Sequence, residues 1–181
     1  MAYFGLSKPI IAKLGTDGTY SEGFECGKAV GTDITPNYSE SSLYGDNELA
    51  EYVKGFTNAD VTLTVTTLPS AAAKVIFGHT TETEGETKYG TQDEPNFVGY
   101  GFIASESVDG DTVYVGTWLP KVKFYEGATS WTTKGESITF ATPQISGKAQ
   151  ADKDSNWKYS QTFGNEAAAV AWLKGKAGMQ S

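Results

Sequence analysis

The chain has 181 residues, a formal net charge of −8 and a pI of about 4.6. All of its basic residues are lysines, which disfavours specific nucleic-acid binding because phosphate neutralisation and guanine recognition depend on basic side chains, arginine above all. This length suits one domain of ordinary size, so a single domain is predicted over residues 1–181.

The first predicted elements are two strands separated by a long connection. Residues 30–34 alternate as in a strand, Pro36 ends this run, and a second alternating strand covers residues 61–65. The connection, residues 36–57, is predicted to be a long loop. Its aromatic and branched side chains disfavour disorder, and an ordered connector of this length is usually functional. We therefore expect another copy of the chain to bury this loop, through contacts made by Leu43, Tyr44, Leu49, Tyr52, Val53 and Phe56.

Two helices are predicted. The first covers about residues 69–77, where an opening proline and three alanines favour a helix that Gly78 ends. The second covers residues 165–175, with Asn165 as the N-cap, a glutamate in the first turn and a lysine near the end, as the helix dipole favours. Between them, the acidic residues 80–94 predict an exposed loop or a loose hairpin.

The remaining predicted elements are strands, which makes the chain mainly β. Residues 97–107 alternate, and Asp109-Gly110 supplies a hairpin turn into a strand over residues 112–119. Pro120 then predicts a bulge or a sheet edge, because proline donates no ladder hydrogen bond. Further strands are predicted at residues 121–124, 137–141, 145–150 and 157–163.

Several other kinds of protein are disfavoured by residue content. The single cysteine, Cys26, cannot form an intramolecular disulfide and is expected to be a small buried residue. No apolar run reaches the roughly 20 residues of a membrane span, so no membrane anchor is predicted. Residues 1–5 lack the basic start of a signal peptide, and we expect synthesis and folding in the cytosol.

Candidate catalytic residues are few. Glu48 and Glu51 beside Tyr52 raise the hypothesis of a glycosidase, which needs two carboxylates facing each other across a cleft. The plainer interpretation is that both carboxylates are solvated. His79, the single histidine, is expected to cap the preceding helix or to pack, and together with Cys26 it gives no zinc-binding spacing. No catalytic residue, cofactor site or metal site is predicted.

The four tryptophans suggest an alternative function. Trp118, Trp131, Trp157 and Trp172 could form a sugar-binding platform with the tyrosines, although packing in a core or an interface is the favoured interpretation. A monomeric carbohydrate-binding or glycoside-hydrolase β-sandwich is therefore kept as the alternative, and it predicts an open aromatic cleft. A secreted adhesin domain is disfavoured because neither a signal peptide nor a disulfide is predicted.

Short segments along nearly the whole chain form an ordered series. They are FGL at 4–6, TPN at 35–37, LYGDN at 43–47, ADVTL at 59–63, LP at 68–69, FGH at 77–79, VGYGF at 98–102, KVKF at 121–124, TKGES at 133–137 and TPQISG at 142–147. In this order they resemble the major tail protein, or tail-tube protein, of long non-contractile-tailed bacteriophages (siphophages). Pro120 departs from the uninterrupted strand that the resemblance leads us to expect.

The resemblance implies a β-sandwich or barrel-like tail-tube fold with a short flanking helix and a C-terminal helix. It further implies hexameric rings that stack into a tube, with inner strands closed into one barrel and DNA passing through the lumen without specific binding. The net negative charge of the chain suits such a lumen because it repels the phosphate backbone of DNA. The implied protein is structural rather than enzymatic, uses no cofactor, and is made in the host cytoplasm before it enters the virion. Its implied partners are its own copies, the tape-measure protein, the tail terminator, and distal tail or baseplate proteins.

Overall fold

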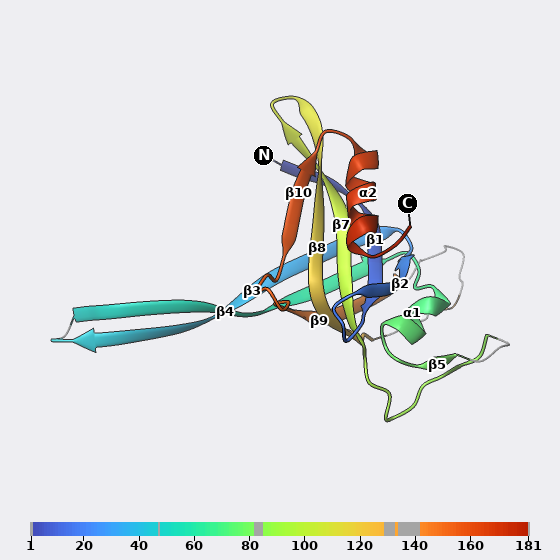
Figure 1. The fold of residues 1–181 in the computed structure, drawn as a ribbon, viewed down its shortest axis with the longest axis horizontal. Coiled ribbons are helices and arrows are strands. Elements are labelled where there is room, and N and C mark those ends of the chain that lie inside the picture. Colours follow the sequence, from blue (N-terminus) through green and yellow to red (C-terminus); the bar gives the residue numbers. More distant parts are fainter. Residues whose placement is uncertain (1, 47, 82–84, 129–132, 134–141, 181) are drawn as a thin grey trace.

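The computed structural model describes residues 2–46, 48–81, 85–128, 133 and 142–180, and it confirms a mostly β protein with two helices (Figure 1). The helices are α1 (Ser70–Val75) and α2 (Glu166–Lys176). The strands are β1 (Ala2–Leu14), β2 (Tyr20–Glu25), β3 (Ala29–Gly45), β4 (Glu48–Val65), β5 (Thr80–Thr81), β6 (Thr87–Lys88), β7 (Phe97–Val108), β8 (Asp111–Glu126), β9 (Gln144–Gln150) and β10 (Tyr159–Phe163). The strand predicted at residues 137–141 lies outside the described residues.

Eight of the described strands form one antiparallel sheet. Their order is β2-β1-β7-β8-β9-β4-β3, and β10 also pairs with β8. The first half of β8 pairs with β10 and the second half with β9, and Pro120 lies between the two halves. The register with β7 shifts at the same place, between Val98 and Tyr100. The bulge predicted at Pro120 is confirmed, and it lies where a missing N–H disturbs the ladder least.

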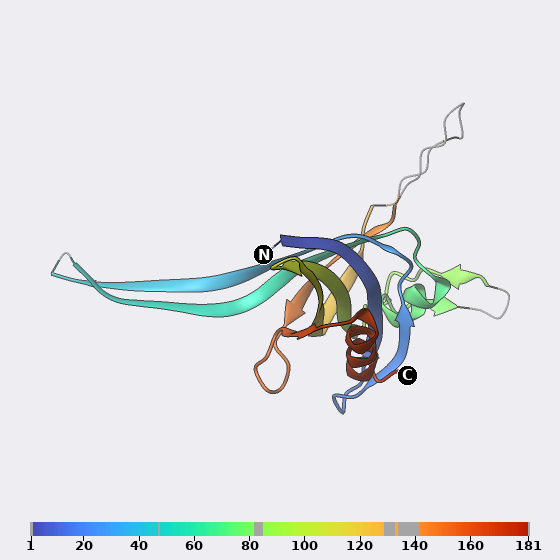
Figure 2. The ribbon, with the colours of Figure 1, turned by 90° about the horizontal axis from the view of Figure 1, so that it is seen from above.

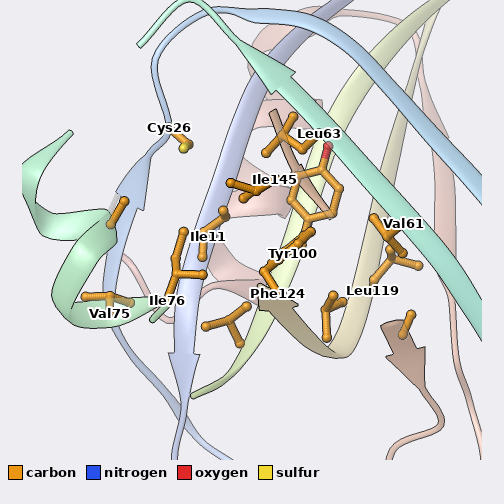
Figure 3. Packing of buried hydrophobic residues seen from close by; sticks show 14 of the residues in the cluster. Ile11, Cys26, Val61, Leu63, Val75, Ile76, Tyr100, Leu119, Phe124 and Ile145 are labelled. Carbon is orange, nitrogen blue, oxygen red and sulfur yellow. The ribbon is translucent and has the colours of Figure 1, made fainter. Parts of the chain in front are cut away.

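The sheet curls strongly, and its concave side encloses the main core (Figure 2). Figure 3 shows Ile11, Leu63, Tyr100, Phe124 and Ile145 meeting there from five different strands, all of them fully buried. This arrangement gives the barrel-like shape that the resemblance implies.

One polar contact crosses this core. The Tyr100 hydroxyl donates a hydrogen bond to Oγ1 of Thr32, at 3.0 Å, and so joins β7 to β3. Burial raises the pKa of Tyr100, so the phenol stays neutral and keeps its proton for this bond. The bond satisfies a hydroxyl that would be costly to bury alone.

The short helix α1 closes one end of the core. Val75 and Ile76 pack in the same cluster as Cys26, whose pKa burial raises to about 12. The buried role predicted for this cysteine is confirmed. The helix ends at Val75, two residues before the predicted end, with Ile76 as its C-cap. Gly78 follows with a φ of +75°, and the backbone N–H of His79 donates to the carbonyl of Ala73 at 3.0 Å. A glycine accepts this left-handed conformation without strain.

The C-terminal helix α2 packs on the face of the sheet opposite the main core. Its buried Ala169 and Leu173 cover Trp118, which is only 1% exposed. The predicted N-cap is confirmed, because the Asn165 side chain accepts a hydrogen bond from the N–H of Ala168 at 2.8 Å.

Residues 36–57 are not a loop. They belong to β3 and β4, which pair from Ala29 opposite Val65 to Gly45 opposite Glu48. Pro36 lies inside β3 and does not end it, which is tolerated because β3 is an edge strand of the sheet. The alternation that marks a strand depends on one face being buried, and both faces of this segment are largely exposed. The alternation of apolar and polar residues is therefore weak in the outer parts of β3 and β4, although these residues form strands.

The acidic residues 80–94 are a loose hairpin where the structure describes them. Thr80 and Thr81 of β5 pair with Lys88 and Thr87 of β6. This small hairpin forms a sheet of its own beside α1 (Figure 1). Of the two forms predicted for this segment, the loose hairpin is confirmed.

The contact between α2 and the sheet predicts that Gly101 cannot be replaced by a larger residue without loss of stability. A Cβ added at Gly101 would lie 2.4 Å from Cδ1 of Leu173 and 2.7 Å from the carbonyl oxygen of Thr117. Gly101→Ala should therefore lower the free energy of unfolding by about 1–3 kcal/mol, measured by urea denaturation. Gly164→Ala is the control, because an added Cβ there meets nothing within 4 Å. Equal stability of the two variants would contradict this packing.

Candidate assembly surface

The outer parts of β3 and β4 form a long two-stranded ribbon that projects from the body (Figures 1 and 2). Within the described residues, β4 pairs with β9 from Ala59 to Thr64, and the ribbon begins where that pairing stops. We call residues 37–46 and 48–58 the projecting hairpin. Two-stranded ribbons are marginally stable in water on their own, so a further contact is expected to support it.

One face of the projecting hairpin is held by its own side chains. Nζ of Lys54 lies 2.7 Å from Oε1 of Glu40 and 4.8 Å from the centre of the Tyr38 ring. Hydrogen bonds from Lys54 and Tyr52 hold the pKa of Glu40 below its usual value. Each of these exposed contacts is weak, and together they order this face, which we call the braced face.

The opposite face carries exposed apolar and small side chains. Ser41 pairs with Val53, and Leu43 with Glu51, so these four side chains share one face. Leu43 is 62% exposed and Val53 is 58% exposed. Ser39 and Gly55 continue this surface toward the body. We call these six residues the open face.

The base of the projecting hairpin is anchored to the body by stacked aromatic rings. Phe56 lies 4.8 Å from Trp157, centre to centre, with the two rings 15° from parallel. Tyr38 meets the edge of Phe56 at 6.1 Å. Aromatic pairs of this kind favour a defined angle between the hairpin and the sheet.

The structure brings the six predicted contact residues onto this one hairpin. Leu43, Tyr44, Tyr52 and Val53 are exposed, by 50–69%. Phe56 is half-buried against Trp157 of the same chain. Leu49 lies in β4 opposite Tyr44, and its side chain is outside the described part of the structure. Contact with another copy stays a prediction for all six.

The sequence analysis missed three exposed apolar residues at the starts of β1 and β3. Tyr3, Phe4 and Val30 are 69%, 50% and 55% exposed. The adjacent aromatic residues Tyr3 and Phe4 are the sequence feature that could have indicated this exposed surface. Val30 belongs to an alternating run, which is typical of a strand with one buried face, so the sequence does not predict its exposure.

A second polar cluster surrounds His79, where α1 meets the end of β8. Nδ1 of His79 lies 2.6 Å from Oδ2 of Asp93, and Nε2 lies 3.2 Å from Oε1 of Glu126 without the alignment of a hydrogen bond. Burial opposes the charge of His79, but contacts with Asp93 and Glu126 outweigh it and raise its pKa. The hydrogen bond from His79 lowers the pKa of Asp93. The cluster joins residues 85–96 to the body of the protein.

The other residues considered from sequence do not form a catalytic or sugar-binding arrangement where they are described. Trp118 is buried under α2, Trp157 stacks on Phe56, and Trp172 packs against Phe163. Trp131 lies outside the described residues, and Glu51 is an exposed side chain on the open face. In the described part of the chain, no group of three or more His, Cys, Asp or Glu side chains could hold a metal ion. None of the described helices is both long enough and apolar enough to span a membrane.

A curled antiparallel sheet that extends an exposed β-hairpin is typical of proteins that assemble through strands. The comparison with protein families agrees. The family model of the phage tail tube protein matches residues 12–171. The chain belongs to this family, and it is a structural protein of a phage tail and thus of the virion.

Among solved structures, the chain is similar to the anti-feeding prophage cap, a tube-terminating cap determined by cryo-EM. The two share 14% identity over 87% of this chain and 89% of that chain, with a TM-score of 0.43. The search of curated proteins finds no match.

The His79 cluster predicts a pH-dependent stability. A histidine with a raised pKa stabilises the fold fully below its unfolded pKa, about 6.5, and this stabilisation is lost as the pH rises through the folded pKa. The lowered pKa of Asp93 keeps that carboxylate charged at pH 6. His79→Gln should therefore lower the melting temperature more at pH 6 than at pH 9, measured by circular dichroism.

The matched control for this prediction is Thr32→Val. It removes an uncharged acceptor of a hydrogen bond, so it should cost the same at both pH values. An equal loss at pH 6 and pH 9 for His79→Gln would show that His79 is not charged in the folded protein.

Proposed function

We propose that this chain forms hexameric rings that stack into the tail tube of a siphophage, the conduit for DNA delivery into the host. Residues 1–181 act as one tail-tube domain, made in the host cytoplasm. The observation that carries the proposal is the projecting hairpin, which leaves Leu43 and Val53 exposed far from the core. Exposed apolar side chains gathered on one surface favour burial against a partner.

The edges of the sheet support assembly from copies of the chain. β3 is a long edge strand, and an exposed edge invites pairing unless it is covered. Closing such edges around a ring removes them, as closure does in a barrel. A contact in which a hairpin meets a different surface of the next copy is heterologous, and such contacts build open filaments.

The charge of the chain suits a DNA conduit. A net charge of −8 with no arginine gives a surface that repels the phosphate backbone. DNA would pass such a lumen without being held. The tape-measure protein, the tail terminator and the distal tail or baseplate proteins would meet the two ends and the inside of the tube.

The carbohydrate-binding alternative receives no support from the described tryptophans. Trp118 is 1% exposed, and Trp157 and Trp172 pack on aromatic neighbours of the same chain. A saccharide platform needs aromatic faces open to solvent, so no second function is proposed.

The proposal predicts that charge on the open face blocks assembly. The purified wild-type chain, concentrated alone, should form tubes or stacked rings of uniform diameter in negative-stain electron microscopy. Leu43→Asp with Val53→Asp should reduce the polymerised fraction about tenfold or more by light scattering, because burying a carboxylate in an apolar contact is costly. Its melting temperature should stay close to that of wild type, because both side chains lie outside the core.

The control carries the same change of charge elsewhere. Thr112→Asp with Gln161→Asp alters two exposed positions of the body and should polymerise like wild type. Tubes of normal length from the Leu43 and Val53 variant would refute the role of the open face. A wild-type chain that stays monomeric at every concentration would contradict self-assembly.

A further inference from the structure

An apolar groove lies between the start of β1 and the start of β3. Its volume is about 720 Å³, and its lining includes Tyr3, Phe4, Leu6, Val30 and Phe102. Three of these side chains, Tyr3, Phe4 and Val30, are at least half exposed. Together they form an apolar surface that nothing in the described part of the chain covers, and we call it the β1–β3 groove.

The walls of this groove are strand edges. β1 pairs with β2 only from Ile10 to Leu14, so within the described residues one edge of the first part of β1 has no partner strand. β3 is the last strand of the sheet order, so its outer edge also lacks a partner there. Apolar side chains between two free edges fit an extended strand or hairpin better than a small ligand.

The groove cannot be filled by the hairpin of its own chain. Residues 30–34 of β3 form one wall, and the same strand then continues outward as the projecting hairpin. In Figures 1 and 2 the tip of that hairpin points away from the body. A hairpin that occupies the groove must therefore come from a second molecule.

We propose that the β1–β3 groove receives the open face of the projecting hairpin of a second copy of this chain. This inference rests on the proposed function and adds the surface that the hairpin meets. Leu43 and Val53 would lie against Tyr3, Phe4 and Val30, which buries the exposed apolar side chains of both surfaces. Ser39, Ser41 and Gly55 are small and allow the hairpin to approach the groove closely.

Opposite charges on the two surfaces favour one orientation of the hairpin in the groove. Glu51 lies beside Leu43 on the open face and is exposed, and the groove lining includes the exposed Lys158. An exposed ion pair adds little affinity, but it disfavours the reversed orientation. Since groove and hairpin are different surfaces, each copy can give one hairpin and receive another, and the assembly stays open-ended.

Disulfide cross-linking tests the proposal. Val53→Cys with Val30→Cys places one thiol on the open face and one in the groove, and a disulfide forms only when the two Cα atoms come within about 7 Å. The native Cys26 is buried, with a pKa raised to about 12, so it does not compete. Tubes assembled under reducing conditions and then oxidised should give a ladder of covalent oligomers, and unassembled subunits should give none.

The control pair is Val53→Cys with Thr112→Cys, which places the second thiol at the exposed start of β8, next to the turn that joins it to β7. A ladder from the control pair and none from the Val30 pair would overturn the groove as the receptor while leaving the tube intact. Failure of the wild-type chain to form tubes would instead overturn the proposed function. The two failures are thus distinguishable.

Charge reversal provides a second test that needs no cysteine. Glu51→Lys alone and Lys158→Glu alone should each slow polymerisation about threefold, and the two changes in one chain should restore the wild-type rate. Both side chains are exposed, so neither change threatens the core. Equally slow assembly of the double variant and the single variants would overturn the proposed pairing.

Discussion

The pairing of β3 with β4 is the interaction on which the rest of the structure depends. At its inner end, Val61 and Leu63 of β4 are fully buried in the core, and Tyr100 holds β3 through Thr32. At its outer end the same two strands leave the sheet and continue without a third strand in the described residues. The backbone hydrogen bonds between β3 and β4 thus continue from the well-packed core into the solvent-exposed hairpin and keep its two strands paired.

Stability and assembly therefore depend on different parts of the chain. The core supplies stability through burial on the concave side of the sheet and under α2. The projecting hairpin contributes little to that stability, because most of its contacts are exposed. It is therefore free to carry Leu43 and Val53, which would be unfavourable in a monomer but are useful in an assembly. The Phe56–Trp157 stack holds the hairpin at a fixed angle to the body.

Several elements could be predicted from sequence because their signals are local. The helix predicted at residues 165–175 is observed at Glu166–Lys176, since an N-cap and the terminal charges define it. The turn at Asp109-Gly110 and the bulge at Pro120 follow from the backbone preferences of glycine and proline.

The hairpin could not be predicted, for a physical reason. Strand recognition depends on one buried face, and the side chains of residues 38–44 and 51–54 are exposed on both faces of the hairpin. Their apolar content predicted contact with another copy, which stays a prediction, and their strand character depends on the pairing of β3 with β4. The β1–β3 groove could not be predicted either, because its lining comes from β1, β3, β7 and residues near β10, which are far apart in sequence and meet only in the folded sheet.

The central claim is that assembly buries the projecting hairpin and protects it from solvent. Hydrogen–deuterium exchange of the amides in residues 38–56, compared between the free subunit and the assembled tube, tests it most directly. The account predicts rapid exchange in the free subunit and strong protection in the tube, with core amides of β7 protected in both. Exchange in the hairpin that is equally rapid in the subunit and in the tube would contradict it.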